Sequence, residues 1–429
     1  MGQQEAGLIG CPDCGVIQRM PPPPSRGRLE CWRCGHVLEQ TTWRSLDAGL
    51  ACALTTLLLL VPANFLTLMT VHVDGIGTST HLAGGVGVAW RQGWPIVAII
   101  LALQGVLLPF VRFGLLSVTL AAIRFGVRGW VGPAFRYCQM LDRWAMADVV
   151  AIGFGVGYGR VAAKIPVHID IGGWCFLGAA IMTLVTRATI ERRAIWRQLV
   201  MPPVEARADP ISCTRCNLVF PADAEGQRCP RCRAILYCRR PRAFMQCAAL
   251  VLACWVLIPV AYWLPMSEFW EAGIPHPHSI IAGIKLLIDH GFWPLAILIC
   301  LASVGIPFGK LFGLTWFLGA ILHGSRWRLR RKTQIYRVID EIGRWSNLDP
   351  FAVMIFAPMV QFGQLAHIDV MSGSLAFLSM VVLSMIAALA FDPRLMWDAV
   401  EKQPALGPLV QLSLSADRHV QIGHQAVGE

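Results

Sequence analysis

The chain has 429 residues, of which 55% are hydrophobic and only 15% are charged, and its mean hydropathy is +0.55. Soluble domains carry about 25% charged residues, so this composition excludes an ordinary soluble protein. Several apolar runs reach the roughly 20 residues that span a bilayer, which predicts an integral membrane protein. The net charge of +11 does not indicate a nucleic-acid partner, because the basic residues cluster beside the apolar runs, where membrane orientation accounts for them.

The N-terminal segment, residues 1–46, contains two CxxC pairs formed by Cys11, Cys14, Cys31 and Cys34. Two such pairs at this separation indicate a four-thiolate zinc site in a small β-rich ribbon, here called ribbon 1. Redox dithiols are the alternative, but thiol exchange needs a single reactive CxxC, whereas two matched pairs fit a closed tetrahedral site. Residues 1–45 lack the apolar core of a signal peptide, so we expect the N-terminus in the cytoplasm.

The same pattern recurs in residues 211–242, where Cys213, Cys216, Cys229 and Cys232 predict ribbon 2 and a second zinc ion. The other seven cysteines are scattered, mostly in or near apolar segments. This usage favours metal binding in a reducing compartment over a disulfide framework.

Four apolar runs follow each ribbon, which predicts an all-α membrane protein with eight spans. The first transmembrane domain covers residues 47–190, a linker 191–210, the second transmembrane domain 243–392 and a polar tail 393–429. The expected spans are about 47–71, 94–123, 144–163, 173–190, 244–266, 292–322, 346–366 and 375–391.

Matching residues at offsets of 197 to 201 indicate that the two parts are tandem repeats. The matches are Pro62 with Pro259, Met69 with Met266, Trp94-Pro95 with Trp293-Pro294, Pro109-Phe110 with Pro307-Phe308, Arg143-Trp144 with Arg344-Trp345, and His168-Ile169-Asp170 with His367-Ile368-Asp369. Four spans separate the ribbons, so the repeats are parallel. Basic residues are concentrated in the loops after spans two, four and six, so the positive-inside rule places both ribbons and both termini in the cytoplasm.

Ionisable residues inside spans are the strongest pointers to function in a membrane protein. They are few and duplicated here: Arg112 and Lys310 in the second span of each repeat, and Asp148 and Asp349 in the third. One hypothesis pairs Arg112 with Asp148 and Lys310 with Asp349 in an intramembrane polar network. The alternative is that the basic residues snorkel to the interface and the aspartates compensate helix N-termini. No P-loop, GxSxG or HExxH motif is present, and we predict no enzyme activity.

The paired CxxC ribbons, the Pro62-Ala63-Asn64 motif and the Arg143-Trp144…Asp148 motif resemble the paraquat-inducible protein A family. The resemblance covers residues 11 to about 395. It implies an inner-membrane protein that works with a periplasmic MCE-domain tunnel protein to move phospholipid between the inner and outer membranes. The second repeat departs from the motif, with Pro259-Val260-Ala261, so the repeats are not interchangeable.

Two other functions stay open at this point. A zinc- or redox-responsive membrane sensor would make the ribbons the active parts, and a secondary transporter of a small solute would couple to protons through Asp148 or Asp349. Lipid transport is the function that the family resemblance favours.

Overall fold

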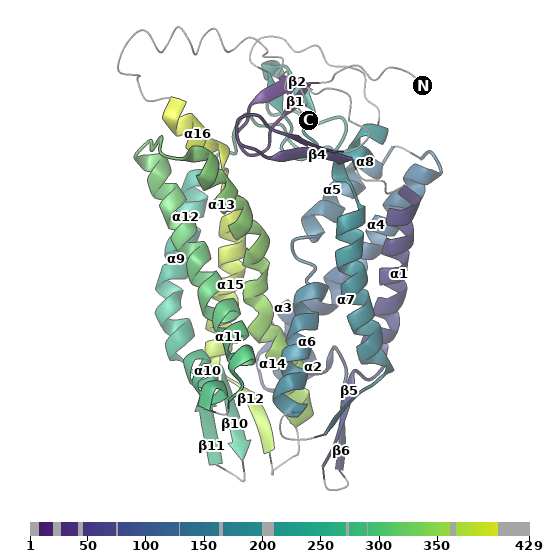
Figure 1. The fold of residues 1–429 in the computed structure, drawn as a ribbon, viewed down its shortest axis with the longest axis vertical. Helices are drawn as coiled ribbons and strands as arrows, with labels where there is room; N and C mark the ends of the chain where they lie inside the picture. The colour runs from purple at the N-terminus through teal and green to yellow at the C-terminus, as the bar shows by residue number, and fades with distance from the viewer. Residues whose placement is uncertain are drawn as a thin grey trace, which may run out of the picture.

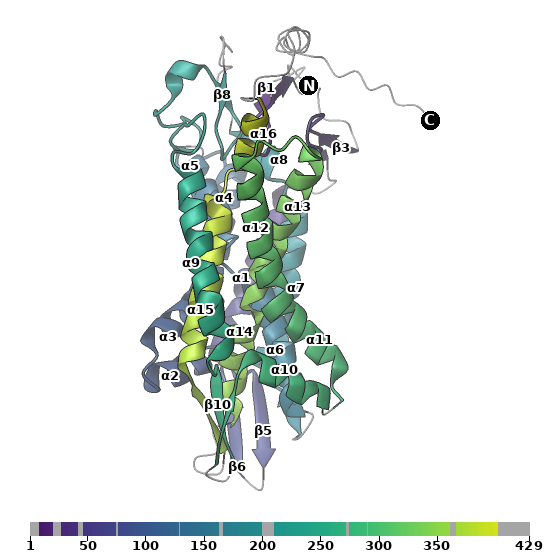
Figure 2. The same ribbon diagram turned by 90° about the vertical axis from the view of Figure 1, so that its left-hand side faces the viewer.

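The computed structural model describes residues 8–19, 27–41, 46–73, 76–127, 129–162, 166–199, 210–271, 274–289, 291–360 and 366–401. Two helical halves stand side by side, with the cysteine ribbons at one end and short β-sheets at the other (Figure 1). The long helices run along the long axis of the molecule in both views (Figure 2). The first half comprises residues 46–199 and the second half residues 243–401.

The elements of the first half are α1 (Leu46–Phe65), β5 (Met69–Val73), β6 (Ile76–Thr80), α2 (Gly84–Arg91), α3 (Pro95–Leu101), the π-helix η1 (Ala102–Leu107), α4 (Leu108–Arg124), α5 (Val131–Leu141), α6 (Ala147–Ala162), β7 (Val167–Ile169), α7 (Ile171–Thr189) and α8 (Arg192–Gln198). The segment between α1 and α3 is therefore a hairpin followed by a helix.

The second half has elements of the same kinds in nearly the same order. They are α9 (Ala243–Trp263), β10 (Ser267–Glu271), β11 (Ile274–His278), α10 (Ile280–Asp289), α11 (Trp293–Cys300), the π-helix η3 (Leu301–Gly305), α12 (Ile306–Leu322), α13 (Leu329–Ile342), the 3₁₀ helix η4 (Gly343–Asn347), α14 (Leu348–Phe356), the 3₁₀ helix η5 (Ala357–Val360), β12 (Ala366–Val370), α15 (Ser372–Ala390) and α16 (Arg394–Glu401). The predicted polar tail thus begins with a helix, and residues 402–429 lie outside the described residues.

In the described part of the chain, six helices are long and apolar enough to cross a membrane. They are Leu46–Phe65, Pro95–Arg124, Ile171–Thr189, Ala243–Trp263, Trp293–Leu322 and Ser372–Ala390. These helices match six of the eight expected spans, and the chain is a multi-pass membrane protein.

The other two expected spans, 144–163 and 346–366, contain shorter helices than the apolar runs suggested. Helix α6 has 16 residues and α14 has nine, and residues 361–365 lie outside the described part. Each helix follows an irregular or 3₁₀ segment that carries an Arg-Trp pair. The amphipathic helices α5 and α13 precede these segments, although their arginines had suggested loops.

Both π-helices lie in the second long helix of their half and end two residues before a proline. Pro109 and Pro307 each occupy one of the first two positions of the α-helix that follows. Proline lacks a backbone N–H and clashes with the carbonyl four residues earlier, so an uninterrupted α-helix would be strained there. The wider π turn accommodates the proline without ending the helix.

At the end away from the ribbons, each half forms one three-stranded antiparallel sheet. The strand orders are β6-β5-β7 and β11-β10-β12. Met69 pairs with Thr80 on one side and Ile169 on the other, so the hairpin after α1 is joined to the strand before α7. Each sheet thus holds together the ends of two long helices that are distant in sequence.

The halves meet along α6 and α14, which contribute to one buried apolar cluster. Val149, Val150 and Phe154 from α6 pack in it with Leu348 and Phe351 from the second half. A Cβ atom at Gly153 would lie 3.0 Å from the backbone nitrogen of Ala352, which shows how closely the two helices approach.

Gln92, which follows α2, adds a polar connection to the second half. Its Nε2 donates to the Ile368 carbonyl at 2.8 Å and to Asp369 Oδ1 at 2.9 Å, and its Oε1 accepts from the Val370 N–H at 2.8 Å. The side chain of a first-half residue therefore extends the hydrogen bonding of β12.

Candidate metal centres and buried charges

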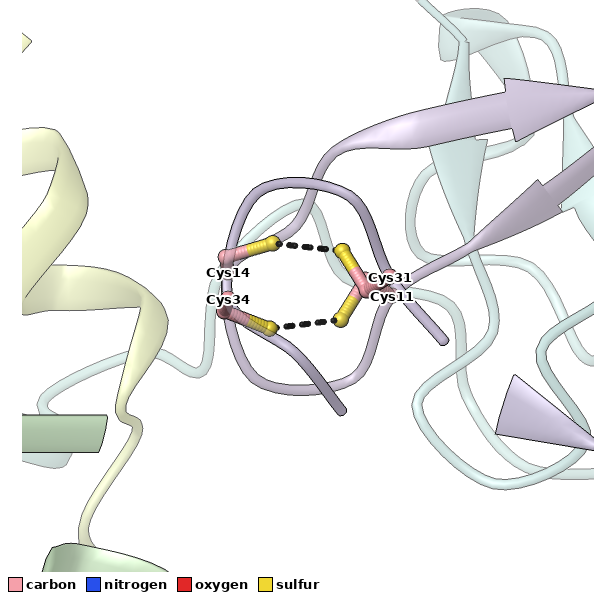
Figure 3. Close-up of side chains that lie close together, drawn as sticks. All are labelled: Cys11, Cys14, Cys31 and Cys34. Carbon is pink, nitrogen blue, oxygen red and sulfur yellow. Dashed lines mark hydrogen bonds between the residues drawn. The ribbon is translucent and has the colours of Figure 1, made fainter. Parts of the chain in front are cut away.

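Ribbon 1 brings its four predicted ligands into one buried cluster. Cys11 Sγ lies 3.5 Å from Cys34 Sγ, and Cys14 Sγ lies 3.6 Å from Cys31 Sγ (Figure 3). The strands β1 (Leu8–Gly10), β2 (Ile17–Arg19), β3 (Gly27–Glu30) and β4 (Val37–Thr41) carry the knuckles. Gly15 closes the first knuckle with a positive φ of 75°, a conformation that glycine adopts without steric cost.

Ribbon 2 has the same arrangement, between β8 (Ile211–Ser212) and β9 (Val219–Phe220) and the segment that follows them. The sulfurs of Cys213 and Cys232 are 3.6 Å apart, as are those of Cys216 and Cys229. In each ribbon the four sulfurs lie within 4.8 Å of one another. A tetrahedral zinc with bonds of about 2.3 Å separates its sulfur ligands by roughly 3.8 Å, so both clusters fit the ion.

Ribbon 1 docks on the second half through α13 and α16. Arg337 of α13 donates from Nε to Asp13 Oδ2 at 2.5 Å, from Nη1 to the Gly35 carbonyl at 3.1 Å and from Nη2 to the Cys34 sulfur at 3.3 Å. Trp397 of α16 belongs to the same buried cluster as the four cysteines. Burial alone would raise the pKa of Asp13, but His36 and Arg337 outweigh it and hold that pKa below its usual range.

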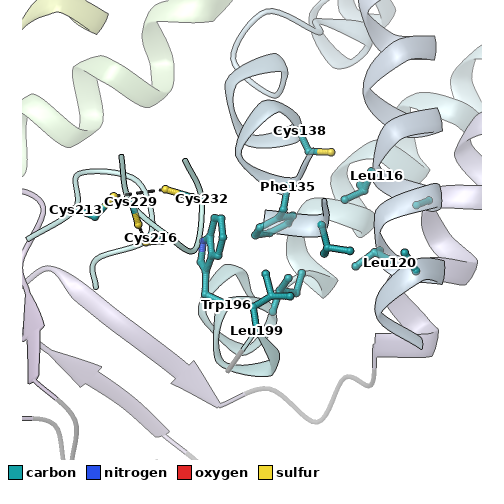
Figure 4. Packing of buried hydrophobic residues seen from close by; sticks show 14 of the residues in the cluster. Leu116, Leu120, Phe135, Cys138, Trp196, Leu199, Cys213, Cys216, Cys229 and Cys232 are labelled. Carbon is teal, nitrogen blue, oxygen red and sulfur yellow. Dashed lines mark hydrogen bonds between the residues drawn. The ribbon is translucent and has the colours of Figure 1, made fainter. Parts of the chain in front are cut away.

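Ribbon 2 docks on the first half. Its cysteines share a buried cluster with Phe135 of α5 and Trp196 of α8, whose rings meet edge to face at 5.1 Å (Figure 4). A Cβ atom at Gly132 would lie 1.8 Å from the carbonyl oxygen of Arg231, so ribbon 2 lies directly against α5. Each ribbon therefore contacts the half that does not follow it in sequence, an arrangement that sequence spacing does not reveal.

Ribbon 1 also reaches the first half through β4. The carboxylate of Glu39 is buried and forms ion pairs with Arg193 at 3.3 Å and with Arg197, both on α8. Ribbon 1 thus contacts both halves and, through Gly10 and Ser212, lies close to ribbon 2 as well.

The predicted residue Arg112 is buried, with only 4% of its surface exposed, so it does not snorkel to water. The sequence suggested Asp148 as its partner, whereas Arg112 Nη2 lies 2.5 Å from Asp142 Oδ1. Arg187 of α7 connects the two carboxylates, with Nε 3.0 Å from Asp142 and Nη1 2.5 Å from Asp148. Arg112 and Asp148 therefore belong to one charged cluster through two residues that sequence reasoning missed.

Asp142 directly precedes the Arg143-Trp144 pair, and Gly343 occupies the same place before Arg344-Trp345. This correspondence between the repeats is the only signal in the sequence that could have identified Asp142. The consequence is an asymmetry between the halves: the buried Lys310 has no carboxylate at that place, and its Nζ lies 3.5 Å from the Gly343 carbonyl. The side chain of Asp349, its predicted partner, lies outside the described residues.

The arginines of the two Arg-Trp pairs each reach the other half. Arg143 Nη2 lies 3.6 Å from Asp340 of α13, and Arg344 Nη1 lies 4.0 Å from Asp148 of α6. These reciprocal contacts extend the charged cluster of the first half across the interface between the halves.

Comparison with known proteins gives one family. The family model for paraquat-inducible protein A matches residues 46–200 and 244–401. The chain is 28% identical to the intermembrane transport protein PqiA of Escherichia coli K12, over 91% of this chain and 95% of that protein. It is 27% identical to the lipophilic envelope-spanning tunnel protein A of the same strain, over 91% of each chain.

A more distant relative is the probable intermembrane transport protein of Haemophilus influenzae, at 22% identity over 92% of this chain and 97% of that protein. No solved structure matches the chain.

The metal sites can be tested by composition and by abundance. We expect two zinc ions per purified chain by elemental analysis, and one after Cys229→Ser. A structural zinc site contributes on the order of 10 kcal/mol to its local fold, so this variant should also lower protein abundance in membranes. Cys238→Ser, which changes an exposed cysteine of ribbon 2 outside the cluster, is the matched control and should keep both ions. Iron, or fewer than two metal ions in the unmodified chain, would contradict the assignment.

Proposed function

We propose that this chain, which belongs to the paraquat-inducible protein A family, is the inner-membrane component of an MCE-type lipid transport system. It moves phospholipid between the inner and outer membranes together with a periplasmic MCE-domain tunnel protein. The observation that carries the proposal is the full-length similarity to relatives whose names describe intermembrane transport and an envelope-spanning tunnel. The chain acts as a transport component and not as an enzyme.

A small apolar pocket, open to the surroundings, lies at the interface between the halves near the end that carries the sheets. Ala89 and Val97 of the first half and Val353 and Leu378 of the second are among the residues that line it.

We assign eight membrane crossings, of which the third and seventh are broken. Helix α14 alone is about 14 Å long at 1.5 Å per residue, less than half of a bilayer core of about 30 Å. Helix α13 precedes α14 and lies nearer the ribbons, as α5 does relative to α6 (Figure 1). Breaks of this kind are tolerated at membrane depth where neighbouring helices or polar side chains satisfy the freed backbone groups.

The charge distribution sets the orientation that we propose. Basic residues crowd the ribbon end, most densely at Arg326, Arg328, Arg330, Arg331 and Lys332, and by the positive-inside rule we assign both ribbons and both termini to the cytoplasm. The sheets then face the periplasm, where a tunnel protein would dock.

The domain boundaries proposed from the sequence suit this arrangement, with ribbons at 1–46 and 211–242 and transmembrane domains at 47–190 and 243–392. Zinc holds each ribbon in shape, and the crossed docking of the ribbons joins the cytoplasmic ends of the two halves.

The buried charges have different roles in the two halves. In the first half, Arg112, Asp142, Arg187 and Asp148 neutralise one another and hold helices together. In the second half, Lys310 lacks the carboxylate that Arg112 has. A buried lysine can release its proton whereas an arginine does not, so we place the functional member of the intramembrane network, with Asp349, in the second half.

Lipid transfer tests the function directly. With the chain in donor vesicles and its tunnel partner bound, radiolabelled phospholipid should appear in acceptor vesicles, and phospholipid should co-purify with the chain. Donor vesicles that hold the tunnel partner alone are the control. Transfer at the control rate, with no co-purifying lipid, would rule the function out.

The proposed orientation makes a labelling prediction. An epitope inserted at Gly77, an exposed position in β6, should be reached by antibody once the outer membrane is permeabilised. The cysteines of both ribbons should stay protected from an impermeant thiol reagent until the inner membrane is opened and zinc is chelated. Labelling of Cys213 from the periplasm would overturn the orientation.

The two buried cations should respond differently to substitution. Lys310→Met should lower transport strongly at near-normal abundance. The second half has Gly343 where the first has Asp142, so the substitution leaves no carboxylate without a partner at that position. Arg112→Met should lower abundance first, because breaking a buried ion pair costs about 3–5 kcal/mol. Lys285→Met, at an exposed position of α10, is the control. Full transport in Lys310→Met and Lys310→Arg alike would show that this lysine has only a structural role.

A further inference from the structure

Helices α5 and α13 present equivalent arginines to the two ribbons. Arg136 stands seven residues before Arg143, and Arg337 stands seven residues before Arg344, at the start of the matching Arg-Trp pairs. Each helix packs against the ribbon that docks on its half. The two ribbon contacts can therefore be compared position by position within one molecule.

At ribbon 1 this arginine has a complete set of partners. Arg337 binds the carboxylate of Asp13 and two backbone carbonyls of the second knuckle. Asp13 is the third residue of the first CxxC motif, Cys11-Pro12-Asp13-Cys14. An anionic oxygen thus sits between the knuckle and the helix.

At ribbon 2 the corresponding carboxylate is replaced by a second cation. The third residue of its first CxxC motif is Arg215, in Cys213-Thr214-Arg215-Cys216. Arg136 Nε is buried and has no hydrogen-bond partner among the residues that the structure describes. The Nε atom of Arg231, in the second knuckle, is also buried there without a partner.

Other cations surround this place. Arg240, Arg143 and Arg136 all lie within electrostatic range of the partly buried Arg215 guanidinium. Arg143 is paired with Asp340, but within the described ranges the side chains of Arg136, Arg215 and Arg240 form no ion pair. The backbone of Arg240 contacts the Asp392 carboxylate, and its guanidinium donates to the Leu389 carbonyl at 2.5 Å.

The charge of the metal centre does not explain why ribbon 2 has Arg215 where ribbon 1 has Asp13. Four thiolates around one zinc ion carry a net charge of about −2 in both ribbons, so this contribution is the same at Asp13 and at Arg215. Buried guanidinium groups without an anion are costly, since each N–H that loses water needs another acceptor.

We propose that Arg136 and Arg215, with Arg240 nearby, form a binding site for a phosphate group where ribbon 2 docks on the first half. The phosphate takes the place that the Asp13 carboxylate has at ribbon 1. Guanidinium groups suit it because their planar donors bind phosphate oxygens in pairs. The phosphate belongs to an anionic lipid of the cytoplasmic leaflet or to free phosphate. The site does not depend on the transport function proposed above.

Thermal unfolding of the full zinc-loaded chain in nanodiscs tests the site and separates the two sources. In phosphatidylcholine nanodiscs, inorganic phosphate should raise the unfolding temperature saturably over chloride at equal ionic strength if the ligand is free phosphate. If the ligand is a headgroup, phosphatidylglycerol nanodiscs should give the increase, and phosphate should add nothing. Either result supports the site. An unfolding temperature that responds to neither overturns it.

Substitutions make the test specific. Arg215→Asp recreates the carboxylate of ribbon 1, so it should raise stability in phosphate-free phosphatidylcholine nanodiscs and weaken the ligand's affinity about tenfold or more. Arg136→Gln should weaken the ligand's affinity by a similar factor but should not raise stability. Zinc content, measured on each variant, should stay at two ions.

Two further variants serve as controls. Arg228→Asp makes the same charge change at an exposed position of ribbon 2 and should keep the full response. Asp13→Asn leaves Arg337 without its carboxylate and should create a second response to the same ligand. Equal losses in Arg215→Asp and Arg228→Asp would show a general effect of charge and overturn the site.

Discussion

The contact between α6 and α14 is the interaction on which the rest of the membrane part depends. Both helices are short, and they approach so closely at Gly153 that a Cβ atom there would lie 3.0 Å from the Ala352 backbone nitrogen. Apolar burial alone gives little preference for one helix contact over another in a bilayer, because lipid tails are as apolar as leucine, so close packing has to provide it. This contact brings the two Arg-Trp segments to opposite sides of one interface, where Arg143 and Arg344 each reach a carboxylate of the other half.

The halves share their order of elements but differ in their charges. The first half places Asp142 beside Arg112 and adds Arg187, which joins Asp142 to Asp148. The second half has Gly343 at the first of these positions, and its buried cation faces a carbonyl. One half therefore has a cluster of paired charges that holds helices together, and the other has a buried lysine without a carboxylate at the matching position. This difference is the reason to assign structural work to one half and a functional group to the other.

The ribbons connect the halves at the opposite end of the molecule. Each contacts the half that does not follow it in sequence, and ribbon 1 also binds α8 of its own half through Glu39. The bond from Arg337 to the Cys34 sulfur ties a candidate zinc ligand to α13. Groups around a metal site that orient its ligands commonly affect metal affinity, so the state of ribbon 1 and the position of α13 are linked. A metal ion bound in ribbon 1 would therefore also act on α13.

Local patterns were enough to predict the four-cysteine sets, because a CxxC motif places its two sulfurs by turn geometry alone. Six long helices and the membrane class were also predictable, since the length of an apolar run is read directly from the chain. The sequence also showed that Arg112 and Lys310 stand at matching positions. It did not show that Asp142 binds Arg112, because Asp142 follows an arginine-bearing helix that looks like a loop until tertiary packing places it beside α4. The crossing of the ribbons and the break before α14 were decided in the same way. Each depends on which segments distant in the chain come together, and residue spacing carries no record of that.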